Sequence, residues 1–533
     1  MAPNQIPNTL STNEHILDAE PPQTDMTIEQ NLTTLQKFYK DANIFITGGT
    51  GFLGKILIEK LLRSASDVQC LYILVRSKKG KNMHSRIQDI FDDPVFDRLR
   101  KEQPKFQHKV QGISGDCSLP NCGISKSDIE MLQSKISIVF HVAATVRFDE
   151  KLKLACAINV VAPRDLVHIA KGMTELKSFM HVSTAYANCH LKEIDEKIYD
   201  PPMDSEKLIT LTQCAPESLL DSVTPTILGD WPNTYAYTKA IAEDVIKQNA
   251  VDLPCGIFRP GIVLSTFKEP IEGWIDNMYG PTGVAAGAAN GLIRTIHCKP
   301  DNVANIIPVD MCVNSLIAAA WEVCDNHEKI LKEKREKTAD DIIVYNYVST
   351  EENPIKWGQF MNLNEFYGFS YPSSKAVYYY AFTMNPNLLI HWMYVILLHY
   401  LPAIIIDGAS LLMGKRPRML KVFQKINRFL FVISYFTTRE WKFNNQNVQN
   451  LNKKLSKEDQ ELFLFDMKKL NWNTFFETYI LGIRIYLVKD PITTLEAAKK
   501  RWTRLYYLHN GIKILSLLVL LRICWYIVSI LYS

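Results

Sequence analysis

The stretch Asn43-Ile-Phe-Ile-Thr-Gly-Gly-Thr-Gly-Phe-Leu-Gly54 decides the fold of this chain. It begins with a short apolar run typical of a buried β-strand, and the segment from Lys55 to Arg63 has apolar residues at helical spacing. A second apolar run, Cys70–Val75, predicts another buried strand. Together these segments predict a strand–turn–helix–strand unit of about thirty residues with its glycines in the turn.

The spacing of the glycines at positions 48, 51 and 54 is typical of a turn that binds a dinucleotide. The first glycine permits the tight turn, the second lets the backbone approach a pyrophosphate, and the third lets the helix pack closely on the sheet. The helix N-terminus then offers free N–H groups and a positive dipole end to the phosphates. A purely structural glycine-rich turn is the alternative. We expect cofactor contacts along the whole turn: Thr47, Gly48, Gly49, Thr50, Gly51, Phe52, Leu53 and Gly54.

Further strand-like runs predict that this unit continues into a larger sheet. They lie at residues 135–142, 179–183 and 255–258, and helical stretches separate them. Alternating strands and helices indicate a parallel sheet that helices cover on both faces. We therefore predict an α/β fold with a Rossmann-type doubly wound parallel sheet up to about Tyr347. Beyond it we expect a mostly helical C-terminal domain, in which apolar helices at residues 388–398 and 403–413 are broken at Pro402.

The composition is that of a globular protein, since 47% of the residues are hydrophobic and 22% are charged. A length of 533 residues predicts two or three domains at roughly 100 to 200 residues each. The net charge of +4 is too small to indicate a nucleic-acid partner, so we expect none. Eleven scattered cysteines form no CxxC pair and no zinc-like spacing, which predicts reduced thiols, no metal site and a compartment facing the cytosol.

The two ends of the chain differ from the rest. Residues 1–28 are polar, contain several prolines, lack the apolar core of a signal peptide, and are expected to be a disordered tail. Residues 514–532 are almost entirely apolar, and as a helix they would span about 29 Å, close to the ~30 Å hydrocarbon core of a bilayer. They predict a membrane segment, although Arg522 lies in its middle at a cost of ~2.5–3.5 kcal/mol. An interfacial helix and a buried core helix are the alternatives.

Basic residues before this apolar run set its expected orientation. The positive-inside rule places the bulk of the chain on the cytosolic side, because the segment is preceded by Lys499, Lys500, Arg501, Arg504 and Lys513. The predicted order is a tail at residues 1–28, a dinucleotide-binding domain at 29–347, a helical domain at 348–510 and a membrane segment at 511–533.

Arg76 follows the second strand, where NAD sites usually place an acidic residue for the ribose 2′-OH. An arginine there suits a 2′-phosphate, which predicts NADPH as the cofactor; a solvated basic turn is the alternative. Asp116, after a further strand, is expected beside the adenine. Small residues at the end of the next strand and an asparagine on the following helix are expected in the same crevice: Ala143, Ala144, Thr145 and Asn159.

Tyr235 and Lys239 are four residues apart, so on a helix they share one face. A phenol has a pKa of about 10, and we expect the nearby ammonium to lower it and so make Tyr235 an acid–base group. A strand ending in Ser183 and Thr184 lies upstream, and either hydroxyl would steady an oxyanion beside the tyrosine. Another strand end is expected to close over the nicotinamide with Pro260, Gly261 and Val263.

The glycine turn, the hydroxyl strand end and Tyr-x-x-x-Lys occur in an order that resembles the extended short-chain dehydrogenase/reductase superfamily over about residues 40 to 345. Several stretches look like fatty acyl-CoA reductases and extend the resemblance to about residues 36 to 485. They are Phe38-Tyr-Lys, Thr47 to Lys55, Asn305 to Asn314, Leu401 to Asp407, Gly414 to Met419 and Phe436 to Trp441, with Phe443 and Asn447.

The resemblance implies an NADPH-dependent enzyme that reduces a long-chain fatty acyl-CoA to a primary alcohol and releases CoA. It also implies an enzyme bound to the membrane of the endoplasmic reticulum or the peroxisome, facing the cytosol. An extended reductase acting on a sterol or sugar nucleotide, and a non-catalytic membrane lipid-binding protein, are the alternatives. A basic cluster from Lys415 to Arg428 would meet CoA phosphates or anionic lipid headgroups, or simply form a solvated helix face.

Overall fold

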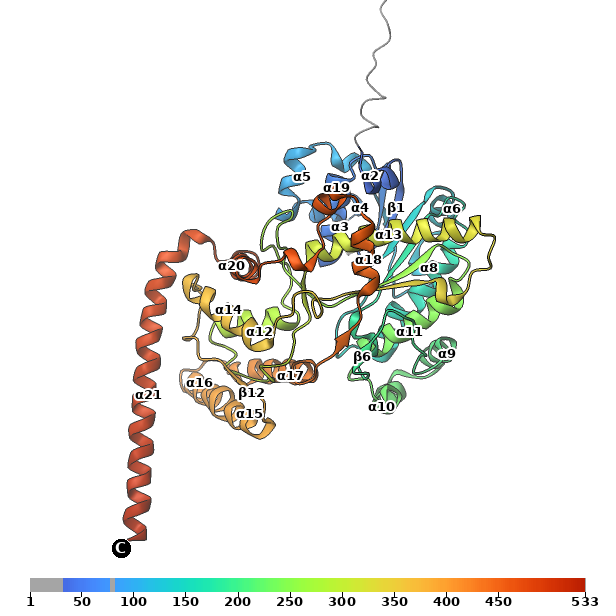
Figure 1. The fold of residues 1–533 in the computed structure, drawn as a ribbon. Helices are drawn as coiled ribbons and strands as arrows, with labels where there is room; N and C mark the ends of the chain where they lie inside the picture. The colour runs from blue at the N-terminus through green and yellow to red at the C-terminus, as the bar shows by residue number, and fades with distance from the viewer. Residues whose placement is uncertain (1–31, 77–81, 533) are drawn as a thin grey trace, which may run out of the picture.

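The computed structural model describes residues 32–76 and 82–532, so the predicted disordered tail lies outside the described residues. Its centre is a seven-stranded sheet of parallel neighbours in the order β11-β7-β5-β4-β1-β2-β3 (Figure 1). The predicted doubly wound parallel sheet is confirmed. Its strands are β1 (Asn43–Thr47), β2 (Cys70–Val75), β3 (Val110–Ser114), β4 (Ile138–His141), β5 (Ser178–Val182), β7 (Cys255–Pro260) and β11 (Ile343–Tyr347).

Side chains of β1 alternate between two apolar clusters because helices cover both faces of the sheet. Ile44 and Ile46 pack in the cluster that contains α3 (Phe52–Ser64) and α13 (Val309–Lys332), whereas Phe45 packs in the cluster on the other face. Such doubly buried strands are almost wholly apolar. The remaining helices of this region are α2 (Thr34–Tyr39), α4 (Met83–Phe91), α5 (Asp97–Glu102), α6 (Lys126–Lys135), α7 (Leu152–Cys156), α8 (Ala162–Ala170), α9 (Ser205–Cys214), α10 (Glu217–Leu228) and α11 (Thr234–Asn249).

The region beyond β11 is mostly helical, as predicted, and it is joined to the first region by short parallel strand pairs. β9 (Thr295–His297) pairs with β12 (Thr383–Asn385), and β6 (Glu193–Ile194) pairs with β13 (Lys442–Phe443). The boundaries after residues 28, 347 and 510 stay predictions. The helices beyond β11 are α14 (Trp357–Ser370), α15 (Leu388–Val395), α16 (Leu401–Leu412), α17 (Met419–Thr437), α18 (Gln446–Lys454), α19 (Lys457–Leu462) and α20 (Trp472–Gly482), and α12 (Gly280–Ala289), which precedes β11, packs against α14.

The expected break at Pro402 is wrong. α15 and α16 are joined by a π-helical turn at Ile396–Tyr400, and the whole run Leu388–Leu412 is one helix of 25 residues. The Leu401 N–H donates to the Ile396 carbonyl, five residues earlier, and Pro402 then lies in the first turn of α16. Because this wider turn comes just before the proline ring, the helix continues without a sharp interruption.

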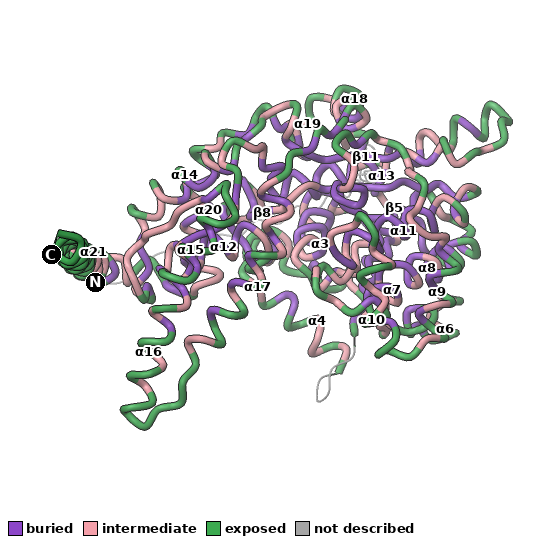
Figure 2. Tube along the Cα trace, turned by 90° about the horizontal axis from the view of Figure 1, so that it is seen from below, coloured by how far each residue is buried: buried purple, intermediate pink, exposed green. Residues whose placement is uncertain are grey.

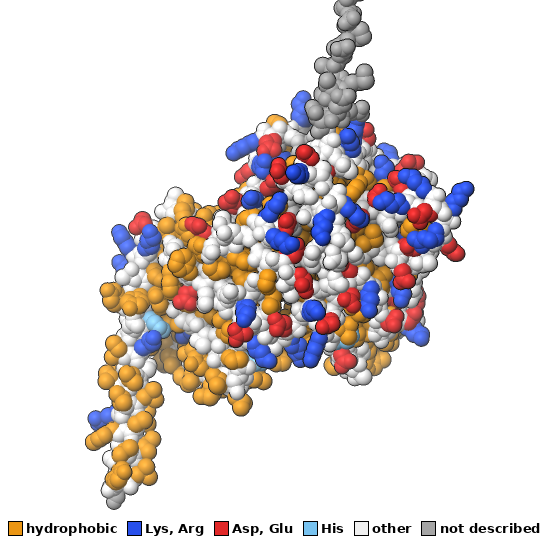
Figure 3. All heavy atoms as spheres, viewed as in Figure 1, with side chains coloured by type: hydrophobic (Ala, Val, Ile, Leu, Met, Phe, Trp, Pro, Cys, Tyr) orange, Lys and Arg blue, Asp and Glu red, His pale blue; other side chains and the backbone are white. Residues whose placement is uncertain are grey.

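The final helix, α21 (Leu495–Leu531), leaves the body and exposes apolar side chains along its carboxyl half (Figures 1 and 3). Among the described residues, two helical runs are long and apolar enough to cross a bilayer, Leu388–Leu412 and Ile492–Leu531. In the second run none of the most apolar window is buried. The predicted C-terminal membrane segment therefore coincides with the exposed carboxyl half of α21, whereas the first half of this helix contacts the body through residues such as Arg501 and His509.

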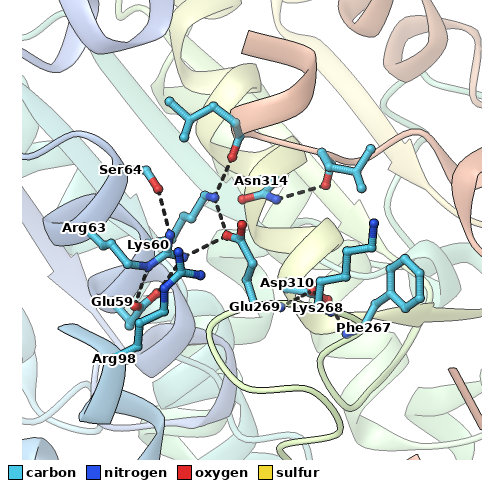
Figure 4. Close-up of polar contacts among 12 residues, drawn as sticks. Glu59, Lys60, Arg63, Ser64, Arg98, Phe267, Lys268, Glu269, Asp310 and Asn314 are labelled. Atoms are coloured by element: carbon cyan, nitrogen blue, oxygen red, sulfur yellow. Dashed lines mark hydrogen bonds and ion pairs between the residues drawn. The ribbon is translucent and has the colours of Figure 1, made fainter. Parts of the chain in front are cut away.

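A charged network joins α3 to the C-terminal region (Figure 4). The Lys60 ammonium is 2.5 Å from Glu269 and donates to the Leu462 carbonyl at 2.6 Å, and Arg63 bridges Glu59 and Glu269. Burial alone would raise the pKa of Glu269, but Lys60 and Arg63 outweigh it and lower that pKa to about 2. Glu269 is thus a carboxylate at neutral pH, and the network holds the end of α19 against the first helix of the dinucleotide fold.

A fully buried ion pair fixes α11 against the sheet. The Arg259 guanidinium, on β7, donates from Nε at 2.8 Å and from Nη2 at 2.6 Å to the two carboxylate oxygens of Glu243, on α11. The two side chains are 0% and 1% exposed. Arg259 also donates to the carbonyls of Asp195 and Lys197. Glu243 lies one turn after Lys239, so this pair determines where the Tyr235–Lys239 face of α11 stands.

We predict that Glu243→Gln lowers the free energy of unfolding by about 3–5 kcal/mol, because it leaves the Arg259 charge buried without a carboxylate. The matched control is Asp325→Asn, which removes a carboxylate from an exposed pair with Lys329 and should cost below about 1 kcal/mol. Denaturant unfolding of the detergent-solubilised chain, followed by tryptophan fluorescence, measures both. Equal effects of the two substitutions would contradict the assigned role of the pair.

Candidate active site

The glycine turn brings the ends of β1 and β4 and the start of α3 into close contact. Gly48 has a φ of +76°, and a Cβ there would lie 2.7 Å from the backbone nitrogen of Ala143. A Cβ at Gly54 would lie 2.2 Å from the Gly48 carbonyl oxygen. Because neither position tolerates a side chain without moving backbone, the first and third glycines act as the sequence predicts for this kind of turn.

The first turn of α3 is open to an anion. Its N-cap is Gly51, which has no side chain to accept hydrogen bonds from the leading N–H groups. The Phe52 ring stacks on Trp274 with centroids 5.4 Å apart, and Leu53 packs against the core, so both side chains hold the start of the helix in place. Gly49 lies against Ile73 of β2, and Thr50 stands in the turn between them. N–H groups and a helix dipole in this arrangement suit a phosphate.

Two polar clamps shape the next part of the crevice. The Thr47 hydroxyl is 2.7 Å from His141 Nδ1 and accepts the Ala143 N–H at 3.3 Å. Asn159 accepts the Thr145 N–H at 3.0 Å and donates to the Thr145 carbonyl and to the Thr238 hydroxyl. Asn159 lies in a π-helical turn, Ala157–Val161, a feature frequent at functional sites. The segment Ala143-Ala144-Thr145 is therefore held between β1 and α11.

Arg76 and Asp116 meet at the far end of the crevice. They follow β2 and β3, which are neighbours in the sheet, and Arg76 Nε is 3.6 Å from Asp116 Oδ2. The Arg76 side chain is 71% exposed, so its guanidinium is available to a ligand. Lys78 and Lys79, which follow it in the sequence, lie outside the described residues.

Thr184, rather than Ser183, faces Tyr235. The Thr184 hydroxyl lies close enough to the Tyr235 phenol to lower its pKa, whereas the Ser183 hydroxyl donates to Glu243 at 2.6 Å. Tyr235 stands in the first turn of α11, whose N-cap Asn233 accepts the Ala236 N–H. Tyr237, the other tyrosine of this turn, is fully buried in a separate apolar cluster. The structure thus brings together Tyr235 and Thr184 and directs Ser183 to the Glu243–Arg259 pair.

The expected effect of Lys239 on Tyr235 is wrong in this structure. Burial raises the pKa of the Tyr235 phenol to about 12, and the nearby Thr184 hydroxyl offsets only part of that rise. The Lys239 ammonium instead donates to the Val182 carbonyl at 2.7 Å. Burial lowers the pKa of Lys239 to about 8, although Glu243 opposes the shift. At neutral pH the tyrosine is therefore a protonated phenol and the lysine is a cation.

The end of β7 closes the opposite side of the crevice. The Gly261 N–H donates to the Tyr347 carbonyl at 2.9 Å, and a Cβ at Gly261 would lie 2.8 Å from the Asn305 carbonyl oxygen. Pro260 is buried, and Val263 is half-buried in β8 (Ile262–Leu264), which pairs with β10 (Ile306–Pro308). These residues sit at the carboxyl edge of the sheet, as Tyr235 and Thr184 do.

Aromatic side chains beside Tyr235 were not predicted. The Phe148 ring lies 5.9 Å from the Tyr235 ring and 5.4 Å from Phe436, and Phe436 also packs edge-on against Tyr186. Phe436 comes from α17, some two hundred positions after Tyr235, so no local pattern could have found it. Glu243 was also missed, although its spacing of four residues from Lys239 was a readable signal.

The crevice fits a nicotinamide dinucleotide. The turn leaves backbone where side chains would intrude, α3 opens with free N–H groups, and Tyr235 and Lys239 stand at the other end of the same sheet edge. The switch in strand order between β1 and β4 is the place where sheets of this kind bind such cofactors. Within the described residues no group of three or more His, Cys, Asp or Glu is placed to hold a metal ion.

Comparison with known proteins agrees with this geometry. Two family models described as "Male sterility protein", one of them an NAD-binding model, match residues 46–316 and 398–490. The chain is 44% identical to the fatty acyl-CoA reductase wat of Drosophila melanogaster, over 89% of this chain and 90% of the relative. It is 38% and 36% identical to fatty acyl-CoA reductase 1 of Xenopus laevis and of Homo sapiens, each over 92% of this chain and 93% of the relative.

Solved structures show the same fold. The reductase domain of a nonribosomal peptide synthetase from Mycobacterium tuberculosis superposes with a TM-score of 0.54 at 17% identity, covering 87% of this chain and 98% of that one. The terminal R domain of the myxalamid pathway gives 0.53 at 16% identity, covering 83% and 90%. Fold and crevice together define a nicotinamide-dependent reductase of the extended short-chain dehydrogenase/reductase superfamily.

Within that superfamily the sequence relatives decide the family. They match along nearly the whole chain, including the helical C-terminal region that the second family model covers. The chain belongs to the fatty acyl-CoA reductase family.

The lowered pKa of Lys239 predicts an alkaline limit to activity. If the lysine acts as a cation, kcat/KM should fall as the pH rises through about 8, because the neutral amine no longer supplies a positive charge to the site. Well above that pH, kcat/KM should fall tenfold for each pH unit. Tyr235, with a pKa of about 12, does not ionise in this range. Initial rates between pH 6.5 and 9.5 measure the profile, and a flat profile across that interval would contradict the prediction.

Proposed function

We propose that this chain reduces a long-chain fatty acyl-CoA to the primary alcohol and releases CoA, at the expense of two NADPH and two protons. The observation that carries the proposal is the 44% identity, over about nine tenths of both chains, to a relative named fatty acyl-CoA reductase. The site supports it, because Tyr235 and Thr184 stand beside an aromatic wall, Phe148 and Phe436, that suits an apolar substrate. The thioester carbonyl of the bound substrate would lie beside the Tyr235 phenol.

NADPH is the proposed cofactor, and when bound it supplies the hydrides of the four-electron reduction. The glycine turn and the first N–H groups of α3 would hold its pyrophosphate. Arg76 would bind the 2′-phosphate, since its guanidinium is exposed at the end of β2 and suits phosphate geometry. The clamped segment Ala143-Ala144-Thr145, Asn159, and the strand end at Pro260, Gly261 and Val263 would line the rest of the dinucleotide site.

Tyr235 is the proposed proton donor. As a phenol it would donate a hydrogen bond to the thioester carbonyl oxygen, with the Thr184 hydroxyl as a second donor, and would protonate that oxygen as negative charge develops on it. Lys239, held by the Val182 carbonyl, would remain a fixed cation beside the site rather than the group that lowers the pKa of Tyr235. The hemithioacetal then loses CoA, and the aldehyde is reduced at the same groups. No cysteine is required, and burial raises the pKa of the nearby Cys189 thiol to about 12.

We also propose that α21 anchors the enzyme with its body in the cytosol, at the endoplasmic reticulum or the peroxisome. Its apolar carboxyl half is exposed and long enough to cross a bilayer. Basic residues that precede it, among them Lys499 and Arg504, favour the cytosolic side for the body.

The activity test uses the full chain in detergent with palmitoyl-CoA and NADPH. We expect free CoA and hexadecanol with two NADPH consumed per alcohol. Tyr235→Phe should lower kcat by about 10²–10⁴-fold, because it removes the proton donor, while NADPH binding followed by fluorescence is retained.

Two further variants separate the strand-end hydroxyls. Thr184→Val should lower kcat strongly, whereas Ser183→Ala should act mainly on stability, because Ser183 contacts Glu243. Absence of CoA release by the unmodified chain would contradict the proposed reaction. Full activity of Tyr235→Phe would contradict only the assignment of Tyr235 as the proton donor.

Cofactor preference is tested at Arg76. Arg76→Asp should lower the NADPH-to-NADH ratio of kcat/KM by about 10- to 100-fold, as expected when a charged hydrogen bond of ~1.5–3 kcal/mol is lost. The control is Arg98→Asp, an exposed arginine on α5, which should leave the ratio unchanged. An unaltered ratio in Arg76→Asp would remove the basis for assigning the 2′-phosphate to this residue.

A further inference from the structure

The helix Leu388–Leu412 has one buried stripe. His391, Val395, His399 and Ala403 follow one another at intervals of four residues, and all of them are buried. This spacing places them on a single face of the helix. The rest of the helix therefore faces away from the body of the protein.

Polar contacts fasten the buried stripe to the body. His399 Nε2 accepts the Arg294 N–H at 3.0 Å, and its Nδ1 lies 2.9 Å from Asn427 Oδ1. His391 Nδ1 lies 3.1 Å from the Thr295 hydroxyl. A helix that crossed a bilayer would have to give up these partners, and unpaired polar groups in a hydrocarbon core cost several kcal/mol each. The helix is long enough to span but is held along the surface of the protein instead.

The outward face is apolar and unusually exposed. Leu389 is 76% exposed, Ile405 is 63% exposed and Leu412 is 92% exposed, and neighbouring leucines and isoleucines extend the same face. Orange side chains gather at this end of the body in Figure 3, on the side from which α21 emerges. A continuous apolar surface of this kind marks an interaction site rather than ordinary protein surface.

Positive charge borders the apolar face. Between Leu388 and Leu430 the chain carries six lysines and arginines and a single carboxylate, Asp407. Asp407 accepts the N–H groups of Arg418, Met419 and Leu420 and so closes the turn between α16 and α17. The basic side chains from Lys415 to Arg428 are exposed, and none of them forms an ion pair within the part of the chain that the structure describes. Unpaired cations beside apolar side chains complement an anionic lipid surface.

The direction of the helix agrees with a position in the plane of a membrane. Figure 1 shows α21 running past the end of the molecule that carries α15 and α16. In Figure 2 α21 is viewed along its axis, and α16 extends across the view and away from the body. If α21 crosses a bilayer, α16 therefore lies roughly parallel to the bilayer surface.

We propose that the outward face of Leu388–Leu412, with the basic residues from Lys415 to Arg428, is a second membrane contact that lies in the headgroup region of an anionic phospholipid bilayer. This contact does not depend on the reaction the enzyme catalyses. It would hold the body against the membrane, with the body's orientation fixed at two places instead of one. The α17 helix would then connect the lipid surface, near Met419, with Phe436 beside the catalytic tyrosine.

The test places a benzophenone amino acid in the full chain at Ile405 or Leu412 and reconstitutes it in vesicles of phosphatidylcholine and phosphatidylserine at 7:3. The control position is Leu331 on α13, which is 62% exposed but lies outside the proposed contact. All variants keep α21, so all are anchored equally. Upon irradiation we expect phospholipid adducts at positions 405 and 412 at least tenfold above position 331, measured by mass spectrometry of the peptides.

Two other results would overturn the proposal. One is adduct formation with a second copy of the chain, which would make the face an interface between copies. The other is a yield equal to that at position 331. The charge component is tested with Lys421→Glu combined with Lys425→Glu, which should lower the yield at position 412 severalfold in these vesicles. In vesicles of phosphatidylcholine alone the two substitutions should change little.

The same vesicles distinguish a helix in the plane from one that crosses. Lys415→Cys, in the turn between α16 and α17, should react with a membrane-impermeant maleimide added outside, as the exposed Cys214 of the body should. Protection of position 415 until detergent is added, with Cys214 labelled, would show that the helix crosses and would overturn the proposed position.

Discussion

The buried pair of Arg259 and Glu243 is the constraint on which the site depends. Two charges at 0% and 1% exposure are stable only because the contact is bidentate and the remaining donors of the guanidinium reach backbone carbonyls. The pair joins β7 to α11, and Ser183 joins β5 to the same carboxylate. One turn of helix separates Glu243 from Lys239 and two turns separate it from Tyr235, so the position of the phenol over the sheet edge follows from an ion pair that touches no ligand.

The glycine turn imposes the complementary constraint at the other end of the crevice. There the backbone of three segments approaches so closely that a single methyl group at Gly54 would overlap the Gly48 carbonyl. Ion pair and turn both act at the carboxyl ends of parallel strands, where a switch in strand order leaves an opening. The dinucleotide fold thus supplies the rigid sheet edge beneath the site, and the helical C-terminal region supplies Phe436, which packs beside Phe148 at its side.

What could be predicted from the sequence was local. The apolar runs of β1 and β2, the glycine spacing and the Tyr235–Lys239 interval each specify a nearby backbone geometry, and the structure has those geometries. Contacts between distant segments could not be predicted. Ser183 and Thr184 are adjacent, and nothing in their local sequence shows that Ser183 reaches Glu243 while Thr184 lies by Tyr235. The pKa of Tyr235 depends on burial by Phe148 and its neighbours, which no interval in the sequence reveals. Pro402 was misjudged because a π turn, which has no sequence signature, precedes it.

These constraints also bear on how an apolar substrate reaches a polar crevice. The α17 helix begins at the turn that Asp407 closes, beside the exposed apolar face, and ends where Phe436 meets Phe148 and Tyr186. A long acyl chain costs roughly 0.8 kcal/mol for each methylene that leaves an apolar environment for water. If the aromatic side chains of the site are reached along a lipid-facing helix, the acyl chain passes from the membrane to an apolar part of the site and that cost is avoided.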